Sequence, residues 1–200
     1  MTYLIIEMPR KALGRSFCSA ALAFSCLAGL AACGTQGQSY GDKPPDYNAA
    51  LAGAPRPLAA LYAQPNRLLS GGTDAFQKRI DGLRGHPVVV NQWASWCGPC
   101  RAEFPWLQRA SARYGKRVAF LGVDSQDSND AAGTFLGEFP VPFPSYTDPD
   151  QKIGQLLQAA RGLPDTSFYD SGGTLVYTRQ GAYADQKALI ADIRRYALGD

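Results

Sequence analysis

The sequence predicts an α/β domain with a mixed β-sheet. Residues 88–93 and 117–124 are runs of β-branched and other apolar residues typical of buried strands, and a segment with helical spacing separates them. Two further extended runs, 165–170 and 175–179, flank Ser171-Gly172-Gly173, which is a hairpin signal. Strands joined through helices pair in parallel and a hairpin pairs antiparallel, so we expect one sheet with both kinds of pairing.

The other expected elements follow in chain order. Residues 58–69 leave two interpretations open, a first strand or an irregular segment packed against the domain. Thr73 or Asp74 can cap a short helix that ends at Arg84-Gly85. The helices expected from apolar spacing are 75–83, 99–114, 130–139, 151–160 and 184–198, and residues 143–147 form a short extended piece.

The N-terminal region has the pattern of a secretory signal. Arg10, Lys11 and Arg15 precede residues 17–32, which carry no charge. A run of that length, rich in Ala and Ser, is too short for a membrane span and suits the apolar part of a signal peptide. The true start is either the first residue or Met8, because the residues before Met8 add an unusual apolar extension.

The signal closes with Leu30-Ala31-Ala32-Cys33-Gly34, which resembles the lipobox of bacterial lipoproteins. The resemblance implies cleavage before Cys33 and lipidation of that cysteine, and two acyl chains would anchor the protein firmly. The alternative is ordinary signal cleavage near Ala32, with Cys33 left as a spare thiol. Cys18 and Cys26 would leave with the signal peptide.

We therefore expect three parts: a lipoprotein signal peptide at 1–32, a flexible tether at 33–63 that starts from the lipidated cysteine, and a folded domain at 64–200. Most of the tether is rich in Gly, Gln, Ser, Pro and Ala and has few large apolar residues. Without the four charged residues of the signal peptide, 17 basic and 16 acidic side chains remain. This near balance gives no reason to propose nucleic-acid binding.

The chemistry is expected at Cys97-Gly98-Pro99-Cys100, where the strand at 88–93 meets the following helix. Two cysteines three residues apart lie one helical turn apart, close enough to form a disulfide. Pro99 is tolerated there because first-turn N–H groups have no helical partner. Cys97 would lie where the helix dipole favours a thiolate, which is the nucleophile of disulfide exchange. We expect Cys97 to attack and Cys100 to resolve.

Two other interpretations of this pair were weighed. A disulfide that only closes a loop would gain little, because so short a loop removes little entropy from the unfolded chain. A zinc site would need two more ligands, and no Cys or His follows Cys100. Redox chemistry is the better interpretation.

The stretch from Trp93 to Pro105, Trp-Ala-Ser-Trp-Cys-Gly-Pro-Cys-Arg-Ala-Glu-Phe-Pro, resembles the active site of the extracytoplasmic thioredoxin-like proteins of the TlpA/ResA family. The one departure is Gln92, where that family usually has an aromatic residue. The resemblance covers roughly residues 64–199. It implies a thioredoxin fold, a central mixed β-sheet flanked by helices, with the helical insertion of the TlpA/ResA kind.

Residues 161–168 resemble the Gly-Val-Pro-Thr-Thr-Phe segment of the same family. In that family the proline, here Pro164, is cis and faces the cysteine pair. The loop could then offer the backbone of Leu163 to a substrate strand. The alternative is an ordinary turn proline at the entrance to a strand.

Three more residues are expected to support the pair. Glu103 lies three residues after Cys100 on the same helix side, and it could take and return the proton of that thiol; alternatively it is a favourable acidic residue in a first helical turn. Asn91 stands where cytoplasmic thioredoxins have a buried Asp, which makes Glu103 the better proton carrier. Trp96 should form a lip that contacts the substrate.

The resemblance implies an enzyme, a membrane-anchored extracytoplasmic thiol–disulfide oxidoreductase that uses its own cysteines and no cofactor. We expect it to reduce exported thiol proteins, such as apocytochrome c, as a monomer supplied with electrons by a membrane donor protein. A disulfide oxidase would use the same site in reverse, since potentials of such pairs span about −120 to −270 mV.

Three alternatives belong to other classes. A copper chaperone on this fold would use Cys-x-x-x-Cys and a distant downstream histidine, both absent from the sequence. A peroxidase of the peroxiredoxin type would need a lone cysteine in a Pro-x-x-x-Thr-x-x-Cys setting, which is also absent. A lipoprotein whose fold serves only for binding would tolerate loss of Cys97.

Overall fold

The structure, a computed structural model, describes residues 43–159 and 162–200. Its helices are α1 Tyr47–Leu51, α2 Arg56–Tyr62, α3 Gly72–Gly82, α4 Gly98–Tyr114, α5 Asn129–Glu138, α6 Lys152–Leu156 and α7 Gln186–Asp192, which a π-helix continues at Ile193–Leu198. Its strands are β1 Leu68–Leu69, β2 Val88–Trp93, β3 Ala119–Ser125, β4 Ser145–Asp148, β5 Asp165–Tyr169 and β6 Leu175–Gln180. The predicted signal peptide, the lipidation site and the start of the tether lie outside the described residues.

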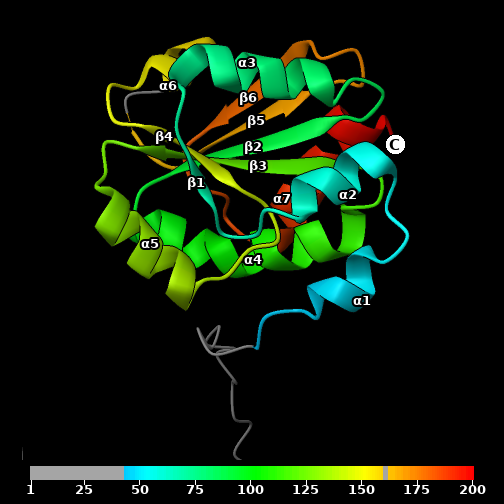
Figure 1. The fold of residues 1–200 in the computed structure, drawn as a ribbon, viewed down its shortest axis with the longest axis horizontal. Coiled ribbons are helices and arrows are strands. Elements are labelled where there is room, and N and C mark those ends of the chain that lie inside the picture. The colour runs from blue at the N-terminus through cyan, green and yellow to red at the C-terminus, as the bar shows by residue number, and fades with distance from the viewer. Residues whose placement is uncertain (1–42, 160–161) are drawn as a thin grey trace, which may run out of the picture. The chain divides into compact units, whose positions relative to one another are not determined.

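The strands form one mixed sheet in the order β1-β4-β3-β2-β5-β6 (Figure 1). Strands β1, β4, β3 and β2 are parallel to one another. Strand β5 pairs antiparallel with β2, and β6 pairs antiparallel with β5. All six residues of the central strand β2 are buried, as expected for a strand that helices cover on both faces. The predicted mixed sheet and α/β class are confirmed.

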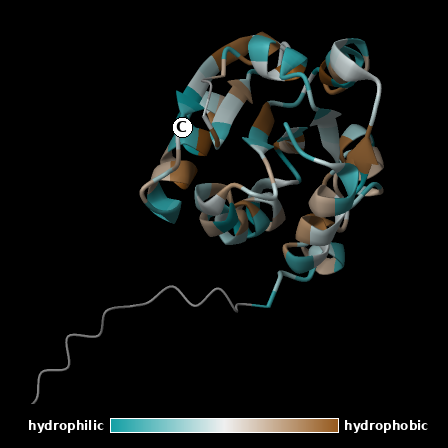
Figure 2. Cartoon of the chain, turned by 90° about the vertical axis from the view of Figure 1, so that its left-hand side faces the viewer, coloured by the Kyte–Doolittle hydropathy of each residue, from teal (hydrophilic) through white to brown (hydrophobic). Residues whose placement is uncertain are grey.

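Helices α3 and α6 cover one face of the sheet, and α4, α5 and α7 cover the other (Figure 1). Side chains alternate along β2, so Val88 and Val90 join the core under α3, whereas Val89 and Trp93 join the core under α4. Hydrophobic and hydrophilic residues also alternate along the helices (Figure 2), the pattern of helices with one buried face. The cysteine pair belongs to the core under α4.

The segment 47–62 is folded, which corrects the prediction of a flexible tether through residue 63. Helix α2 buries Leu58 and Leu61 completely. The hydroxyl of Tyr62 donates a hydrogen bond to the carbonyl of Val118 at 2.7 Å. Two leucines and a tyrosine anchor the segment, whose other residues are mostly Ala, Gly and Pro. The folded domain therefore begins earlier than residue 64.

Two element boundaries differ from prediction at residues with left-handed backbone. The predicted caps Thr73 and Asp74 are wrong, because α3 begins after Gly71, whose φ is 112°. Only glycine fits there, since a Cβ would lie 2.6 Å from that of Ala75. Helix α6 ends before residue 160 because Gln158 has a φ of 54°. Residues 58–69 are neither one strand nor irregular throughout, because α2 covers the first part and β1 is only Leu68–Leu69. The other predicted strands and helices are present within a few residues.

Candidate active site

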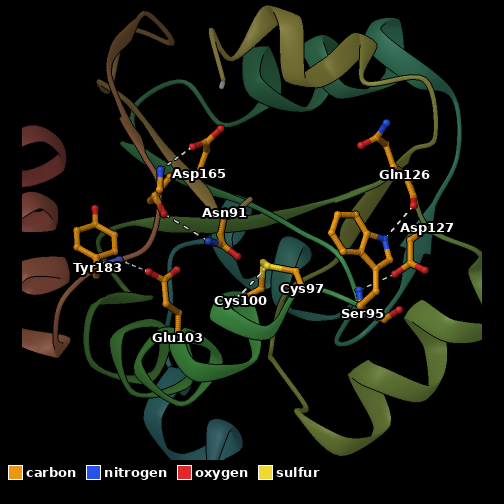
Figure 3. The surroundings of a disulfide bond; sticks show 12 residues. Asn91, Ser95, Cys97, Cys100, Glu103, Gln126, Asp127, Asp165 and Tyr183 are labelled. Atoms are coloured by element: carbon orange, nitrogen blue, oxygen red, sulfur yellow. Dashed lines mark hydrogen bonds between the residues drawn. A yellow bond between two sulfur atoms is a disulfide. The ribbon is translucent and has the colours of Figure 1, made fainter. Parts of the chain in front are cut away.

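A disulfide joins Cys97 and Cys100 at the junction of β2 and α4 (Figure 3). Cys97 is the N-cap residue of α4, and 5.3 Å separates the two Cα atoms. The backbone N–H of Cys100 donates to the Sγ of Cys97 at 3.1 Å. Their side chains are 4% and 1% exposed, respectively. Cys97 is thus slightly more accessible, and the helix N-terminus would favour its thiolate after reduction.

Glu103 lies one turn beyond Cys100 on α4, and its side chain is 2% exposed. Its Oε1 accepts a hydrogen bond from the backbone N–H of Tyr183 (Figure 3). Burial raises the pKa of Glu103 to about 7; Asp165 adds to the rise, whereas the Tyr183 amide and Arg179 oppose it. A carboxyl that titrates near neutral pH is suited to take up and release a proton during thiol chemistry.

Asn91 lies beside the disulfide (Figure 3), buried on β2. Its Nδ2 donates to the hydroxyl of Thr166 at 3.3 Å, and the antiparallel register places these two residues opposite each other. The chain enters β5 through Leu163 and Pro164, which are joined by a cis peptide bond, as the resemblance implies. Pro164 is buried and Leu163 is partly exposed, so Leu163 remains available at the surface.

Asp165 is a site residue that the sequence analysis missed. It is 1% exposed, and its Oδ1 accepts a hydrogen bond from the backbone N–H of Gly181 at 2.9 Å. It is also close enough to Glu103 to raise that pKa. The sequence feature that could have identified Asp165 is its position directly after Pro164, where the loop that faces the cysteines continues into a strand.

Trp96 is 61% exposed beside Cys97, where the sequence predicts a lip that contacts the substrate. Its Nε1 donates to the carbonyl of Gln126 at 3.0 Å, and the N–H of Ser95 donates to the Oδ2 of Asp127 at 2.6 Å (Figure 3). Both acceptors belong to the turn after β3. The lip is therefore held by a segment that sequence reasoning did not connect with the site.

Trp93 points into the core under α4. It is fully buried, and its Nε1 donates to the hydroxyl of Ser145 at 3.2 Å. Gly122 makes room for this contact, because a Cβ there would lie 2.1 Å from the Ser145 Oγ and 2.8 Å from the Trp93 Nε1.

Gln92, the departure from the family pattern, has a structural explanation. It is buried on the face of the sheet that α6 covers, opposite the face with the cysteine pair. There its Nε2 donates to the hydroxyl of Ser125 at 2.8 Å. A Cβ on Gly154 of α6 would lie 2.7 Å from that Nε2. The glutamine thus fills a space that the missing side chain of Gly154 leaves under α6.

The described residues offer no cluster of three His, Cys, Asp or Glu side chains that could hold a metal ion. His86, the single histidine, is partly exposed in the loop before β2. None of the helices in the described part of the chain is long and apolar enough to cross a membrane.

The fold and the cysteine pair together define a thioredoxin-like thiol–disulfide oxidoreductase. A family model described as Redoxin matches residues 41–191, and the chain belongs to this family. The thiol:disulfide interchange protein DsbE of Escherichia coli strain K12 is 33% identical over 142 residues, which are 70% of this chain and 71% of that protein.

Other relatives match over shorter stretches. DsbE of Pseudomonas fluorescens biotype C is 38% identical over 94 residues, 46% of this chain and about half (51%) of that protein. The thiol–disulfide oxidoreductase ResA of Oceanobacillus iheyensis is 29% identical over 115 residues, 57% of this chain and 59% of the relative. Among solved structures, MTB dsbF in its mixed oxidized and reduced forms has a TM-score of 0.53 at 26% identity, covering 58% of this chain and 85% of that chain. These relatives confirm the resemblance seen in the motif.

Proposed function

We propose that this protein is a lipid-anchored, extracytoplasmic reductant of protein disulfides that acts through Cys97 and Cys100. The observation that carries the proposal is the disulfide at the N-terminus of α4 with the buried carboxyl of Glu103 one turn further on. Relatives named as thiol:disulfide interchange proteins support it. The Gly98-Pro99 dipeptide between the cysteines, which is that of thioredoxin, favours reduction over oxidation.

In the proposed reaction the reduced protein first attacks a substrate disulfide. The Cys97 thiolate displaces one substrate sulfur as a thiolate, and a mixed disulfide forms between Cys97 and the other. The Cys100 thiolate then attacks the Cys97 sulfur and releases the second substrate thiolate. The substrate gains two electrons, and the protein returns to the Cys97–Cys100 disulfide.

Glu103 is proposed to handle the proton of this second step. Cys100 must lose a proton before it can attack, and it lies 1% exposed, so bulk water has little access to its thiol. A carboxyl with a pKa of about 7 on the next turn can take that proton and pass it on after the step. Asn91 supports the site without adding a second acid. Leu163 would pair through its backbone with an extended segment of the substrate, and Trp96 would cover that segment.

The proposed location follows from the N-terminal motif. Lipidation of Cys33 would hold the domain at a bacterial membrane, facing the extracytoplasmic side, where exported thiol proteins such as apocytochrome c fold. A membrane protein would supply the electrons, an expectation that comes from the family resemblance alone.

The test of the proposed function is trapping with Cys100→Ser. This variant should stop at the mixed disulfide and hold exported proteins in complexes that a reductant releases. The matched control is Cys97→Ser/Cys100→Ser, which should trap none. Complexes that persist in the double variant, or their absence from the single variant, would contradict the assignment.

The direction is tested by equilibrating the cysteine pair with glutathione buffers. A reductant should have a potential toward the thioredoxin value of about −270 mV. A value near the DsbA potential of about −120 mV would instead identify an oxidase.

A further inference from the structure

The carboxyl group of Asp127 lies on the side of the disulfide opposite Glu103, close to the lip (Figure 3). Asp127 accepts two backbone hydrogen bonds, from Ser95 to Oδ2 at 2.6 Å and from Ser128 to Oδ1 at 2.8 Å. The first of these bonds crosses from the turn after β3 to the loop after β2. It fixes the backbone two residues before Cys97.

The same turn also holds the indole of Trp96. The carbonyl of Gln126 accepts from the Trp96 Nε1 at 3.0 Å, and the Gln126 backbone has a φ of 53°. The side chain of Gln126 accepts from the Nε2 of Gln151 at 3.1 Å. Because 61% of the Trp96 side chain is exposed, core packing contributes little to its position. Its orientation therefore depends on how the turn is held.

A second carboxyl, Asp124, lies near the end of β3, opposite Trp93 in the register, and its side chain hydrogen-bonds with that of Asp127. It is 2% exposed, and its Oδ1 has no hydrogen-bond partner among the described residues. Burial raises the pKa of Asp124 to about 7, and the charge of Asp127 and a side-chain hydrogen bond with it act in the same direction. An ionised carboxylate with one unpartnered buried oxygen and an anionic neighbour is costly, so the protonated form fits this position.

Among the described residues, the elements packed around the two carboxyls form no ion pair with them. Helix α5 adds another acid, Asp130, in its first turn. On β4, the carboxylate of Asp148 is occupied by the amides at the start of α6. On α4, Arg101 pairs with Glu138 instead.

We propose that Asp127, with protonated Asp124 hydrogen-bonded to it, is the positioning residue of the Ser95–Trp96 lip, and that loss of the Asp124 proton releases the lip. When both carboxyls are charged, the buried charge of Asp124 repels the partly buried Asp127 and pushes it away from the Ser95 amide. The indole then loses its fixed orientation beside Cys97. The proposal rests on the proposed function only in giving the lip a substrate to contact.

The test measures how accessible Trp96 is in the oxidised protein as pH changes. Trp93 and Trp106 are 0% and 6% exposed, so acrylamide quenching of fluorescence reports mainly on Trp96, and a Trp96→Phe variant supplies the background. Quenching should increase as pH rises, with a midpoint near the pKa of Asp124, about 7. Asp124→Asn, which stays neutral, should keep the low-pH quenching at every pH. Asp127→Ala should show high quenching throughout, and circular dichroism checks that both variants fold.

Glu103→Gln is the matched control, because it removes the other buried acid with a pKa near 7 and should leave the midpoint in place. A pH-independent signal in the parent protein, or an unchanged midpoint in Asp124→Asn, would overturn the proposal. No substrate or redox turnover is involved, so an inactive oxidoreductase could still show the transition. Failure of the lip mechanism and failure of the proposed function are therefore separate results.

Discussion

Cys97 and Cys100 share a disulfide but differ in their surroundings. Cys97 caps α4 and its sulfur accepts the Cys100 amide, whereas Cys100 lies inside the first turn. After reduction, the positive end of the helix should therefore favour the Cys97 thiolate. We predict that an alkylating agent at mildly acidic pH modifies Cys97 first, as mapped by mass spectrometry. Faster labelling of Cys100 would reverse the assigned roles.

Glu103 should control the pH dependence of turnover. Its pKa of about 7, raised by burial, means that it is neutral below that pH and charged above it. Glu103→Gln keeps size and polarity but cannot exchange the proton. We predict that one limb of the rate profile of disulfide reduction between roughly pH 5 and 9 shifts or disappears. An unchanged profile and rate would mean that the proton travels through water.

The same residue should make stability depend on pH. The folded-state pKa of Glu103 lies above its ordinary value of 4.5, so the folded protein retains this proton while the unfolded chain loses it. The contribution of Glu103 to stability is therefore largest below about pH 4.5 and falls as pH rises to about 7, by roughly 3 kcal/mol. Denaturant unfolding at several pH values should show a shallower fall for Glu103→Gln. A slope equal to that of the parent protein would contradict the burial argument.

Helix α2 is the element whose role differs most from the sequence expectation. Because Leu61 is fully buried, Leu61→Ala should lower the free energy of unfolding by about 2–5 kcal/mol. The control, Ala60→Ser, changes an exposed residue of the same helix and should have little effect. Denaturant titration measures both. If the parent protein and Leu61→Ala were equally stable, α2 would not be part of the folded domain and the prediction of a flexible tether would be correct.

For the whole molecule, the proposed anchor can be tested independently of the fold. Cys33→Ser should leave the precursor unprocessed or release the protein from the membrane, because lipidation requires the cysteine thiol. Fractionation and metabolic lipid labelling measure this outcome, with Cys26→Ser as a control that keeps the lipobox. Unchanged lipid labelling of Cys33→Ser would rule out the lipobox interpretation.

Much of this protein could be predicted from local sequence patterns. Strands and helices were recognisable because side-chain periodicity reflects the local backbone, and even the bounds of β2 were correct. The cysteine pair was recognisable because its spacing places both residues in one helical turn. The many small residues in 47–62 are typical of a flexible tether, but Leu58 and Leu61 are buried against parts of the chain that lie far away in sequence.

The tertiary structure alone decided the environment that tunes the site. Glu103 meets the amide of Tyr183, which lies 80 residues further along the chain, and Ser95 meets Asp127, 32 residues away. Such contacts arise where β2 lies between β3 and β5, and no local pattern encodes them. The sequence by itself therefore predicted the cysteine pair that forms the disulfide and the fold that carries it. The packing of the sheet decided which carboxyls beside the cysteines have a raised pKa, because a pKa depends on burial and neighbouring charge in three dimensions.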